Sequence, residues 1–425
     1  MSAWLLAVLA GVVLVYALLS RRLDRTPVTA AIFFLSAGLL FGNKGLGWID
    51  IAPHGETVRV LAELTLTLVL FADASRIDLA ALRREYVVPA RLLGIGLPLT
   101  IVAGVVIALG VFGPLSFGEA LVLAVILAPT DAALGQSVVT DERIPSRVRQ
   151  GLNVESGLND GLCVPLLFIA IAIADAETPT VTTHQAVVLV FEAIGYGVLF
   201  GVVCGAAGAV LLRLAQARDL AESRWVEAVP VGTAALAYGL AAPLGGSGFI
   251  AAFAAGLAFG ALRRKEEDVT YLLEELGGLA NAVTFIVFGA AIVGPALGAI
   301  TWSVAAYGLL SLTVVRMLPV AVSLIGTRAR SSTVAFLGWF GPRGLASIVF
   351  TVIIVDDANL PHIATTVATV TFTIVVSVYA HGITARPLTA RYADWFHAHP
   401  KDARPEMETA PAPAQRWRLR SSRSH

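Results

Sequence analysis

The chain alternates long apolar segments with short polar ones over most of its length. A helix that crosses a bilayer needs about 20 mostly apolar residues, and the chain offers such stretches repeatedly. Residues 245–248 (Gly-Gly-Ser-Gly) are interpreted as a tight turn between two short spans, the alternative being a break inside one long element. The pattern predicts thirteen membrane spans, with ends good to a few residues, at about 3–20, 26–42, 57–74, 88–113, 118–140, 147–175, 185–215, 226–243, 247–262, 272–293, 297–325, 332–355 and 361–386.

Basic residues alternate from loop to loop along this arrangement. One set of loops contains Arg21, Arg22, Arg25, Arg76, Arg83, Arg84, Arg143, Arg147, Arg149, Arg213, Arg218, Arg224, Arg263, Arg264, Lys265, Arg328 and Arg330. The opposite set contains only Lys44 and Arg59. Because Lys and Arg concentrate in cytoplasmic loops, the alternation predicts an outside N-terminus and a cytoplasmic C-terminus in the cell membrane. The first span has no basic residue before it, so it is interpreted as a membrane helix and not as a cleaved signal.

Composition supports an all-α polytopic membrane protein. The 425 residues are 57% hydrophobic and 14% charged, with a mean hydropathy of +0.79. Soluble globular proteins carry roughly 25% charged residues. The net charge of zero gives no general attraction to nucleic acids. Cys163 and Cys204 lie in apolar runs, which indicates buried side chains and neither a disulfide framework nor a metal site.

The fifth span is interrupted by a proline that polar residues follow. It reads LVLAVILAPTDAALGQSVV, in which Pro129 removes a backbone donor and Thr130 and Asp131 come next. Free carbonyl groups and a carboxylate at this depth survive where they face a cavity or bind something. The alternative is a proline kink whose polar groups are satisfied by neighbouring helices.

The sixth span carries four polar side chains on one face. It reads GLNVESGLNDGLCVPLLFIAIAIA, in which Glu155 stacks with Asn159, and Ser156 with Asp160, at a spacing of four residues. A cluster that only joins helices rarely uses two carboxylates, so this face is predicted to be functional.

Two arginines occupy the eleventh and twelfth spans. Arg316 lies among apolar residues and requires an acidic partner, for which Glu155 is a good candidate. Arg343 lies in Gly341-Pro342-Arg343-Gly344, which interrupts the twelfth span. A direct substrate role for Arg343 and a kinked helix with an inward-pointing arginine are equally compatible with this sequence.

The two interrupted spans, the fifth and the twelfth, lie seven spans apart. If spans 1–6 and 8–13 are inverted repeats, the interruptions occupy equivalent places, as at the binding site of many transporters. Half-helix ends then meet at the centre. Asp131 can offset their positive ends and Arg343 their negative ends.

These motifs resemble a known family. APTD at 128–131, VESGLND at 154–160, the lone Arg316 and FGPRGLAS at 340–347 are similar to motifs of the monovalent cation–proton antiporter family, in its NhaP/NHE-like branch. The resemblance implies a thirteen-helix sodium/proton antiporter fold with inverted repeats, two crossed discontinuous helices and elevator-like alternating access. It also implies a homodimer and a transporter that is not an enzyme.

Placed on this chain, the resemblance implies a transmembrane domain over 1–386. The Pro- and charge-rich segment 387–425 is interpreted as a short, mobile cytoplasmic tail. The mobile core corresponds to about 88–175 and 297–386, and the dimerisation or scaffold helices to about 1–74 and 185–293.

The resemblance also implies residue roles. Asp160 is similar to the carboxylate that binds the ion and exchanges the proton. Asp131, Ser156 and the main chain of Thr130 are similar to its supporting ligands, so that Asp160, Ser156 and Thr130 would hold the monovalent metal cation. Asn159 resembles the asparagine of the electroneutral branch, where electrogenic relatives carry a second aspartate.

Further positions match more loosely or have other implied roles. Glu155 and Arg316 resemble a structural ion pair. Asp73 is a possible accessory acidic residue, although Ala72 is the alternative equivalent position. The family's glycine–leucine–arginine–glycine has a proline at its second position here, so the local backbone at Arg343 departs from the pattern.

Elementary physics favours the same function. Burial disfavours a charged carboxylate, so Asp160 can hold a proton, and a dehydrated cation needs the oxygen ligands that surround it. Proton and cation then compete for one site, and either of them neutralises it for passage across an apolar barrier. We expect sodium, with lithium or potassium as alternatives, to be exchanged 1:1 for protons without any cofactor.

Two other classes of membrane protein remain as alternatives. An ion channel would need a continuous polar pore or a filter of repeated carbonyl groups, and neither is visible. An intramembrane hydrolase would need an aspartate dyad or a histidine-based metal site. The spacing of Asp131 and Asp160 does not exclude such a dyad.

Overall fold

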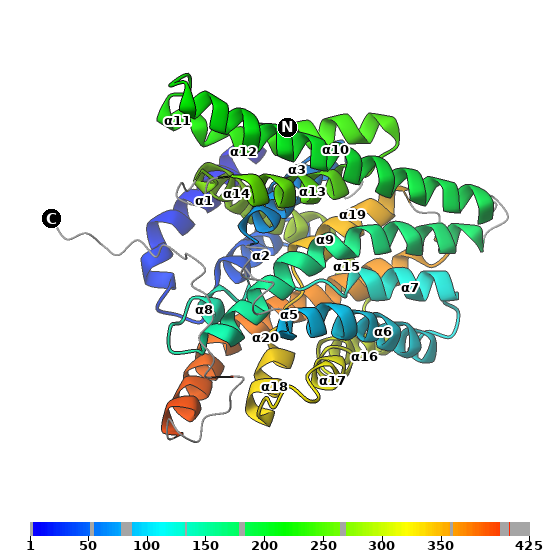
Figure 1. Ribbon diagram of the computed structural model, residues 1–425. Coiled ribbons are helices and arrows are strands. Elements are labelled where there is room, and N and C mark those ends of the chain that lie inside the picture. The colour runs from blue at the N-terminus through cyan, green and yellow to red at the C-terminus, as the bar shows by residue number, and fades with distance from the viewer. Residues whose placement is uncertain are drawn as a thin grey trace.

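The structure is a computed structural model that describes residues 3–51, 55–77, 87–131, 134–177, 183–263, 269–357, 360–399 and Glu408. It is built almost entirely of helices (Figure 1). The helices of the first part are α1 (Ala3–Leu23), α2 (Ala30–Phe41), α3 (Glu56–Arg76), α5 (Val87–Arg91), α6 (Leu97–Val111), α7 (Phe117–Ile126), α8 (Gln136–Val139) and α9 (Ser146–Ala176). The following helices are α10 (Thr183–Ala217), α11 (Ser223–Val226), α12 (Ala228–Ala241), α13 (Gly248–Leu262), α14 (Tyr271–Val287), α15 (Gly294–Ala296), α16 (Trp302–Leu312), α17 (Val314–Ser323), α18 (Ser331–Trp339), α19 (Leu345–Asp357) and α20 (Ile363–Ala398).

The long helices are membrane-spanning by length and composition. In the described ranges, eight continuous helical stretches are long and apolar enough to cross a membrane: Ala3–Leu23, Val87–Val111, Ser146–Ala176, Val187–Ala217, Arg224–Leu244, Tyr271–Ala299, Trp302–Ser323 and Ile363–Ala398. Shorter apolar helices include α2, α7, α13 and α19. The predicted all-α, multi-pass architecture is therefore confirmed. The exact number of thirteen crossings stays a prediction, although each predicted range overlaps a helix.

Side-chain caps set several helix starts. The hydroxyl groups of Thr29, Ser116, Ser247 and Thr301 each accept a hydrogen bond from the backbone N–H three residues later. Such a cap satisfies one of the backbone donors left free at a helix N-terminus. The turn predicted at 245–248 is present: Gly245 has φ of +81° and Ser247 caps α13. Glycine adopts this left-handed conformation without steric cost.

Two helix ends differ from the ends of the predicted spans. The helix of the span predicted from about residue 297 begins at Trp302, because a π-helical segment at Phe288–Val293 and α15 extend the preceding helix, and Thr301 caps the new one. Helix α20 extends beyond the span end predicted at about residue 386, through Pro387 to Ala398. The aromatic ring of Tyr392 stacks on Phe336, with centroids 4.3 Å apart, and this packing holds the extra turns.

The helices form two groups with α9 between them (Figure 1). On one side, α10 packs on α13 and α12, and α13 packs on α3. On the other side, α6 packs on α7 and α17, and α16 packs on α20. Helix α9 contacts members of both groups, including α7, α3 and α10. A polar face on α9 is therefore placed at the centre of the protein.

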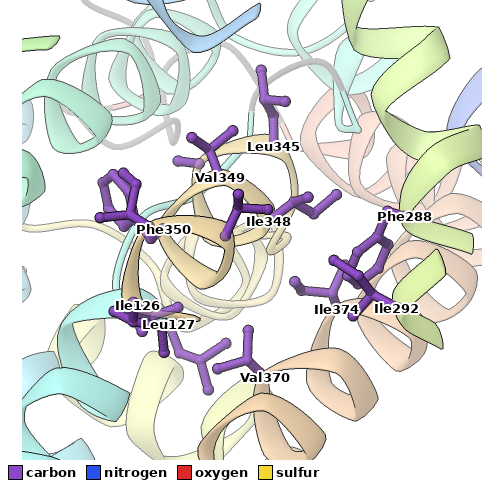
Figure 2. Close-up of a cluster of buried hydrophobic side chains, with 14 of the residues drawn as sticks. Ile126, Leu127, Phe288, Ile292, Leu345, Ile348, Val349, Phe350, Val370 and Ile374 are labelled. Carbon is purple, nitrogen blue, oxygen red and sulfur yellow. The ribbon is translucent and has the colours of Figure 1, made fainter. Parts of the chain in front are cut away.

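Apolar packing fixes the helix α19 next to that centre. Figure 2 shows Leu345, Ile348, Val349 and Phe350 of α19 surrounded by residues of other helices. The surrounding labelled side chains are Ile126 and Leu127 at the end of α7, Phe288 and Ile292 after α14, and Val370 and Ile374 of α20. All of them belong to one buried cluster, so the half-helices α7 and α19 are locked against each other.

Candidate functional site

Both predicted helix interruptions are present as unwound segments. Helix α7 ends at Ile126 and the next helix, α8, begins at Gln136. Helix α18 ends at Trp339, and α19 begins at Leu345. Pro129 and Pro342 supply no backbone N–H, so each removes one bond from the helical hydrogen-bond ladder at its interruption. We call the interruption after α7 the first break and the interruption between α18 and α19 the second break. Each break leaves backbone groups that need partners in the protein interior.

The two breaks satisfy one another through Asp131. Its backbone N–H donates to the carbonyl oxygen of Pro342 at 2.8 Å. Its Oδ2 atom accepts the backbone N–H of Leu345 at 3.0 Å. Leu345 is the first residue of α19, so a carboxylate faces the positive end of that helix. Gly344 makes this approach possible, since a Cβ atom there would lie 2.1 Å from Asp131 Oδ2.

Arg343 makes the reverse connection. Its side chain is fully buried, and Nη1 donates to the carbonyl oxygens of Ala128 at 2.8 Å and Pro129 at 3.0 Å. These carbonyl groups follow the C-terminal end of α7, where a cation is favourable. Arg343, which belongs to the second break, therefore binds the backbone of the first break. Its Nε and Nη2 atoms have no hydrogen-bond partner among the described residues.

Helix α9 presents its polar face to the first break. Ser156 Oγ donates to the carbonyl oxygen of Thr130. Asn159 Oδ1 accepts the backbone N–H of Thr130 at 3.3 Å, and its Nδ2 donates to Thr130 Oγ1 at 2.7 Å. The three residues are buried, so these bonds replace the helical partners that Thr130 lacks.

Asp160 lies on the same face but differs from its neighbours. It is 6% exposed, and its Oδ1 atom has no hydrogen-bond partner in the described part of the chain. Native proteins pair nearly all buried polar atoms, so such an oxygen requires an explanation. A bound proton or cation would supply the missing partner.

A second acidic residue on α9 is paired instead. The carboxylate of Glu155 accepts two hydrogen bonds from Arg316 of α17, Nη1 to Oε1 at 2.5 Å and Nη2 to Oε2 at 2.9 Å. Both side chains are buried. This two-point geometry is the strongest form of carboxylate–guanidinium pairing.

Asp73 reaches the same region from α3. A Cβ atom on Gly157 of α9 would lie 3.4 Å from Asp73 Cβ, so the two helices touch beside Asp160. The charges of Asp131 and Asp73 both act on Asp160. Asp73 is partly exposed, whereas Asp160 is buried. An ionised Asp160 is thus surrounded by like charges, which a cation or a proton would offset.

The arrangement provides oxygen ligands of a kind suited to a small hard cation. Carboxylate, hydroxyl and carbonyl oxygens come from Asp160, Ser156 and Thr130. Among the described residues, no group of three His, Cys, Asp or Glu side chains could hold a metal ion. The arrangement is suited to reversible binding of a cation or a proton, either of which neutralises the Asp160 carboxylate.

Three residues of this region were missed at the sequence level. Ser377 and His381 of α20 are buried beside the second break, and Ser347 Oγ donates to the carbonyl oxygen of Ile126 at 2.7 Å. His381 is an ionisable residue inside a predicted span, which is a signal that the rule for polar residues in membranes would have detected. The serines carry no comparable signal.

Comparison with known proteins gives a consistent result. A model of the family "sodium/hydrogen exchanger, transmembrane" matches residues 8–391. Na(+)/H(+) antiporter 2 of Zygosaccharomyces rouxii is 27% identical over 338 residues, which are 73% of this chain and 41% of the relative. K(+)/H(+) antiporter NhaP of Alkalimonas amylolytica is 27% identical over 350 residues, or 81% of this chain and 58% of the relative. The chain therefore spans about half the length of these relatives.

The fold has a solved counterpart. The structure of the sodium proton antiporter MjNhaP1 from Methanocaldococcus jannaschii superposes with a TM-score of 0.75. The match covers 92% of this chain and 98% of the other, at 20% sequence identity. The two chains therefore share one fold.

Proposed function

Because the chain belongs to the sodium/hydrogen exchanger family, we propose that it is a secondary antiporter that exchanges a monovalent cation for protons across the cell membrane. Sodium is the proposed cation, with potassium as the alternative because curated relatives include antiporters named for either ion. No cofactor takes part, since the cation and the proton are the substrates.

One observation supports this proposal above the others. Asp160 is buried with an unpartnered carboxylate oxygen among the described residues, one helical turn after Ser156, whose hydroxyl group binds the Thr130 carbonyl group. A proton or a cation on Asp160 gives a neutral site that can cross an apolar barrier, whereas the empty, ionised site is penalised. Competition of the two ligands for one carboxylate couples their movements.

Each remaining residue has a proposed role. Asp131, Ser156, Thr130 and Asn159 support the ion site. Glu155 and Arg316 form a structural pair. Asp73 and Arg343 are accessory residues.

The two groups of helices support a proposal of alternating access. The core, about 88–175 and 297–386, carries the site and moves like an elevator against the scaffold, about 1–74 and 185–293. The scaffold also forms a homodimer. The N-terminus lies outside the cell and the C-terminus in the cytoplasm, as the basic loops favour.

The experiment is a cation scan in everted membrane vesicles that carry a proton gradient. Sodium, lithium and potassium are added in turn, and dissipation of the gradient is followed by fluorescence. Asp160→Asn should abolish the response while the protein inserts and folds, whereas Asp175→Asn, at the far end of the same helix, should respond like wild type. Near-normal exchange by purified, reconstituted Asp160→Asn protein would refute the assignment.

A further inference from the structure

Helix α20 carries two polar residues that face the second break and have no part in the proposed ion site. Ser377 and His381 are four residues apart, so they lie on one face of the helix. They are 0% and 1% exposed. Buried polar groups at membrane depth are costly unless they perform a task.

Ser377 binds the break directly. Its Oγ atom accepts the backbone N–H of Arg343 at 2.7 Å. This N–H lies between α18 and α19, where no helical carbonyl group is available to it. The hydroxyl group of Ser377 therefore fixes the backbone of the residue whose side chain reaches the other break.

His381 binds the end of α18. Its Nε2 atom lies 2.9 Å from the carbonyl oxygen of Trp339, the last residue of that helix. A carbonyl oxygen only accepts, so this contact is a hydrogen bond when Nε2 carries the hydrogen. On the other side of the ring, Nδ1 lies 3.1 Å from Ser377 Oγ and 2.9 Å from the backbone carbonyl oxygen of Ser377. The imidazole ring thus joins Ser377 to the helix terminus.

The connection continues to the ion site through Arg343. Its Nη1 atom holds the carbonyl groups of Ala128 and Pro129. The next residue is Thr130, whose carbonyl group and amide meet Ser156 and Asn159 on α9. Helix α20 is therefore connected to Thr130, Ser156 and Asn159, which support the proposed ion site, by hydrogen bonds and short backbone segments that run across both breaks.

We propose that Ser377 and His381 are positioning residues that hold the two helix breaks in the geometry required for cation binding. This inference rests on the proposed antiport function and adds two residues to it. Outer-sphere groups of this kind orient ligands without touching the ion, and their loss typically lowers affinity.

The test uses purified protein in proteoliposomes, with sodium and lithium titrated against proton movement. Ser377→Ala should raise the apparent KM for the cation about 10-fold with a smaller effect on the maximal rate. Ser377→Thr keeps a hydroxyl group and should restore most of the affinity. His381→Gln, whose amide group can still donate to the Trp339 carbonyl group, should lie between wild type and His381→Leu.

Thr384→Val is the matched control. Thr384 Oγ1 accepts the Trp339 indole N–H at 3.0 Å, so it also joins α18 to α20 but makes no bond to the broken backbone. The apparent KM of Thr384→Val for the cation should match that of wild type. The rise in melting temperature on adding cation, measured in detergent, gives a second readout, which should shrink for Ser377→Ala and persist for Thr384→Val.

The outcomes separate the two proposals. Wild-type protein that shows no cation-dependent proton movement refutes the antiport function itself. Normal wild-type exchange beside an unchanged KM in Ser377→Ala and His381→Gln overturns only the positioning role. An equal loss of affinity in Thr384→Val overturns it too, because general docking of α18 on α20 would then be the cause.

Discussion

Two acidic residues on one face of α9 have opposite surroundings. Glu155 has a guanidinium partner bound at two points, whereas Asp160 has an oxygen without a partner among the described residues. A neutralised carboxylate needs no further ligand, but an unpaired one does. This contrast, and not the residue type, separates the proposed structural acid from the proposed transporting acid.

The Glu155–Arg316 pair should contribute to stability. Arg316→Ala leaves a buried, uncompensated carboxylate, which we expect to cost about 3–5 kcal/mol. Thermal melting in detergent should show the loss, and Glu155→Gln combined with Arg316→Gln should recover part of it. Single variants that melt like wild type but no longer transport would mean that the pair acts in transport.

Ser156→Ala should have a milder effect than any change of Asp160. It removes one neutral oxygen and its hydrogen bond to the Thr130 carbonyl group, and leaves the charged ligand in place. The apparent KM for the cation should rise while the maximal rate changes little, in the same proteoliposome assay. Complete loss of exchange would show that Ser156 is essential rather than supporting.

At the scale of elements, the two broken helices depend on close approach. The backbone of one break lies against the side chains of other segments, with Asp131 over Gly344 and Arg316 over Gly341. A Cβ atom on Gly341 would lie 2.3 Å from Arg316 Nε. Side chains can approach the backbone this closely because neither glycine carries a Cβ atom.

Gly344→Ala should therefore disturb the site. Its methyl group would overlap Asp131 Oδ2, and overpacking of this kind costs about 1–3 kcal/mol. We expect weaker cation affinity and a lower melting temperature. Gly239→Ala on α12 is the control, since a Cβ atom added there would meet nothing within 4 Å among the described residues. Equal cation affinity and equal melting temperature of the two variants would argue against close packing of Asp131 on Gly344.

Glu408 joins the C-terminal segment to α18. It is 3% exposed, and its Oε1 atom accepts from the backbone N–H of Arg330 at 3.2 Å and from Thr333 Oγ1 at 2.7 Å. The rest of the tail beyond residue 399 lies outside the described residues. The mobility of the tail stays a prediction.

Glu408→Ala should lower the melting temperature in detergent. It removes the acceptor of the part-buried Arg330 N–H and of the buried Thr333 hydroxyl group, which costs about 1–3 kcal/mol. Glu222→Ala is the control, because Glu222 pairs with Arg224 at the surface, where ion pairs contribute about 0–1 kcal/mol. A melting temperature that is unchanged in Glu408→Ala would show that this contact does not stabilise the protein.

For the whole molecule, the proposed mechanism gives Asp160 as the carboxylate that exchanges the proton. Glu155 is held by Arg316, and Asp131 faces the first turn of α19. Asn159 cannot titrate, and both ends of its amide group are bound to Thr130. If Asp160 alone exchanges a proton for a cation, one cycle moves no net charge.

We therefore expect electroneutral exchange. Reconstituted protein should move protons against a sodium gradient at one rate whether or not valinomycin and potassium clamp the membrane potential, provided that potassium is not a substrate. A rate that changes steadily with the imposed potential would show that net charge moves. A second carboxylate, Asp131 first among them, would then take part.

Patterns within the sequence predict the fold class, the approximate positions of the helices and the residues around the breaks. The membrane requires long apolar stretches and penalises ionisable residues within them, so Asp131, Glu155, Asp160, Arg316 and Arg343 were evident as exceptions. Proline and the i, i+4 spacing placed the breaks and the polar face of α9, because both act within one helix.

The pairing of these groups depends on how the helices pack in three dimensions. Nothing within one helix indicates that Arg343 binds the carbonyl groups of Ala128 and Pro129, or that Ser377 holds the Arg343 backbone. The sequence also missed the end of α20, since its last turns are held by Tyr392 packing on another helix. Such contacts join residues far apart in the chain, and their geometry depends on how whole helices pack.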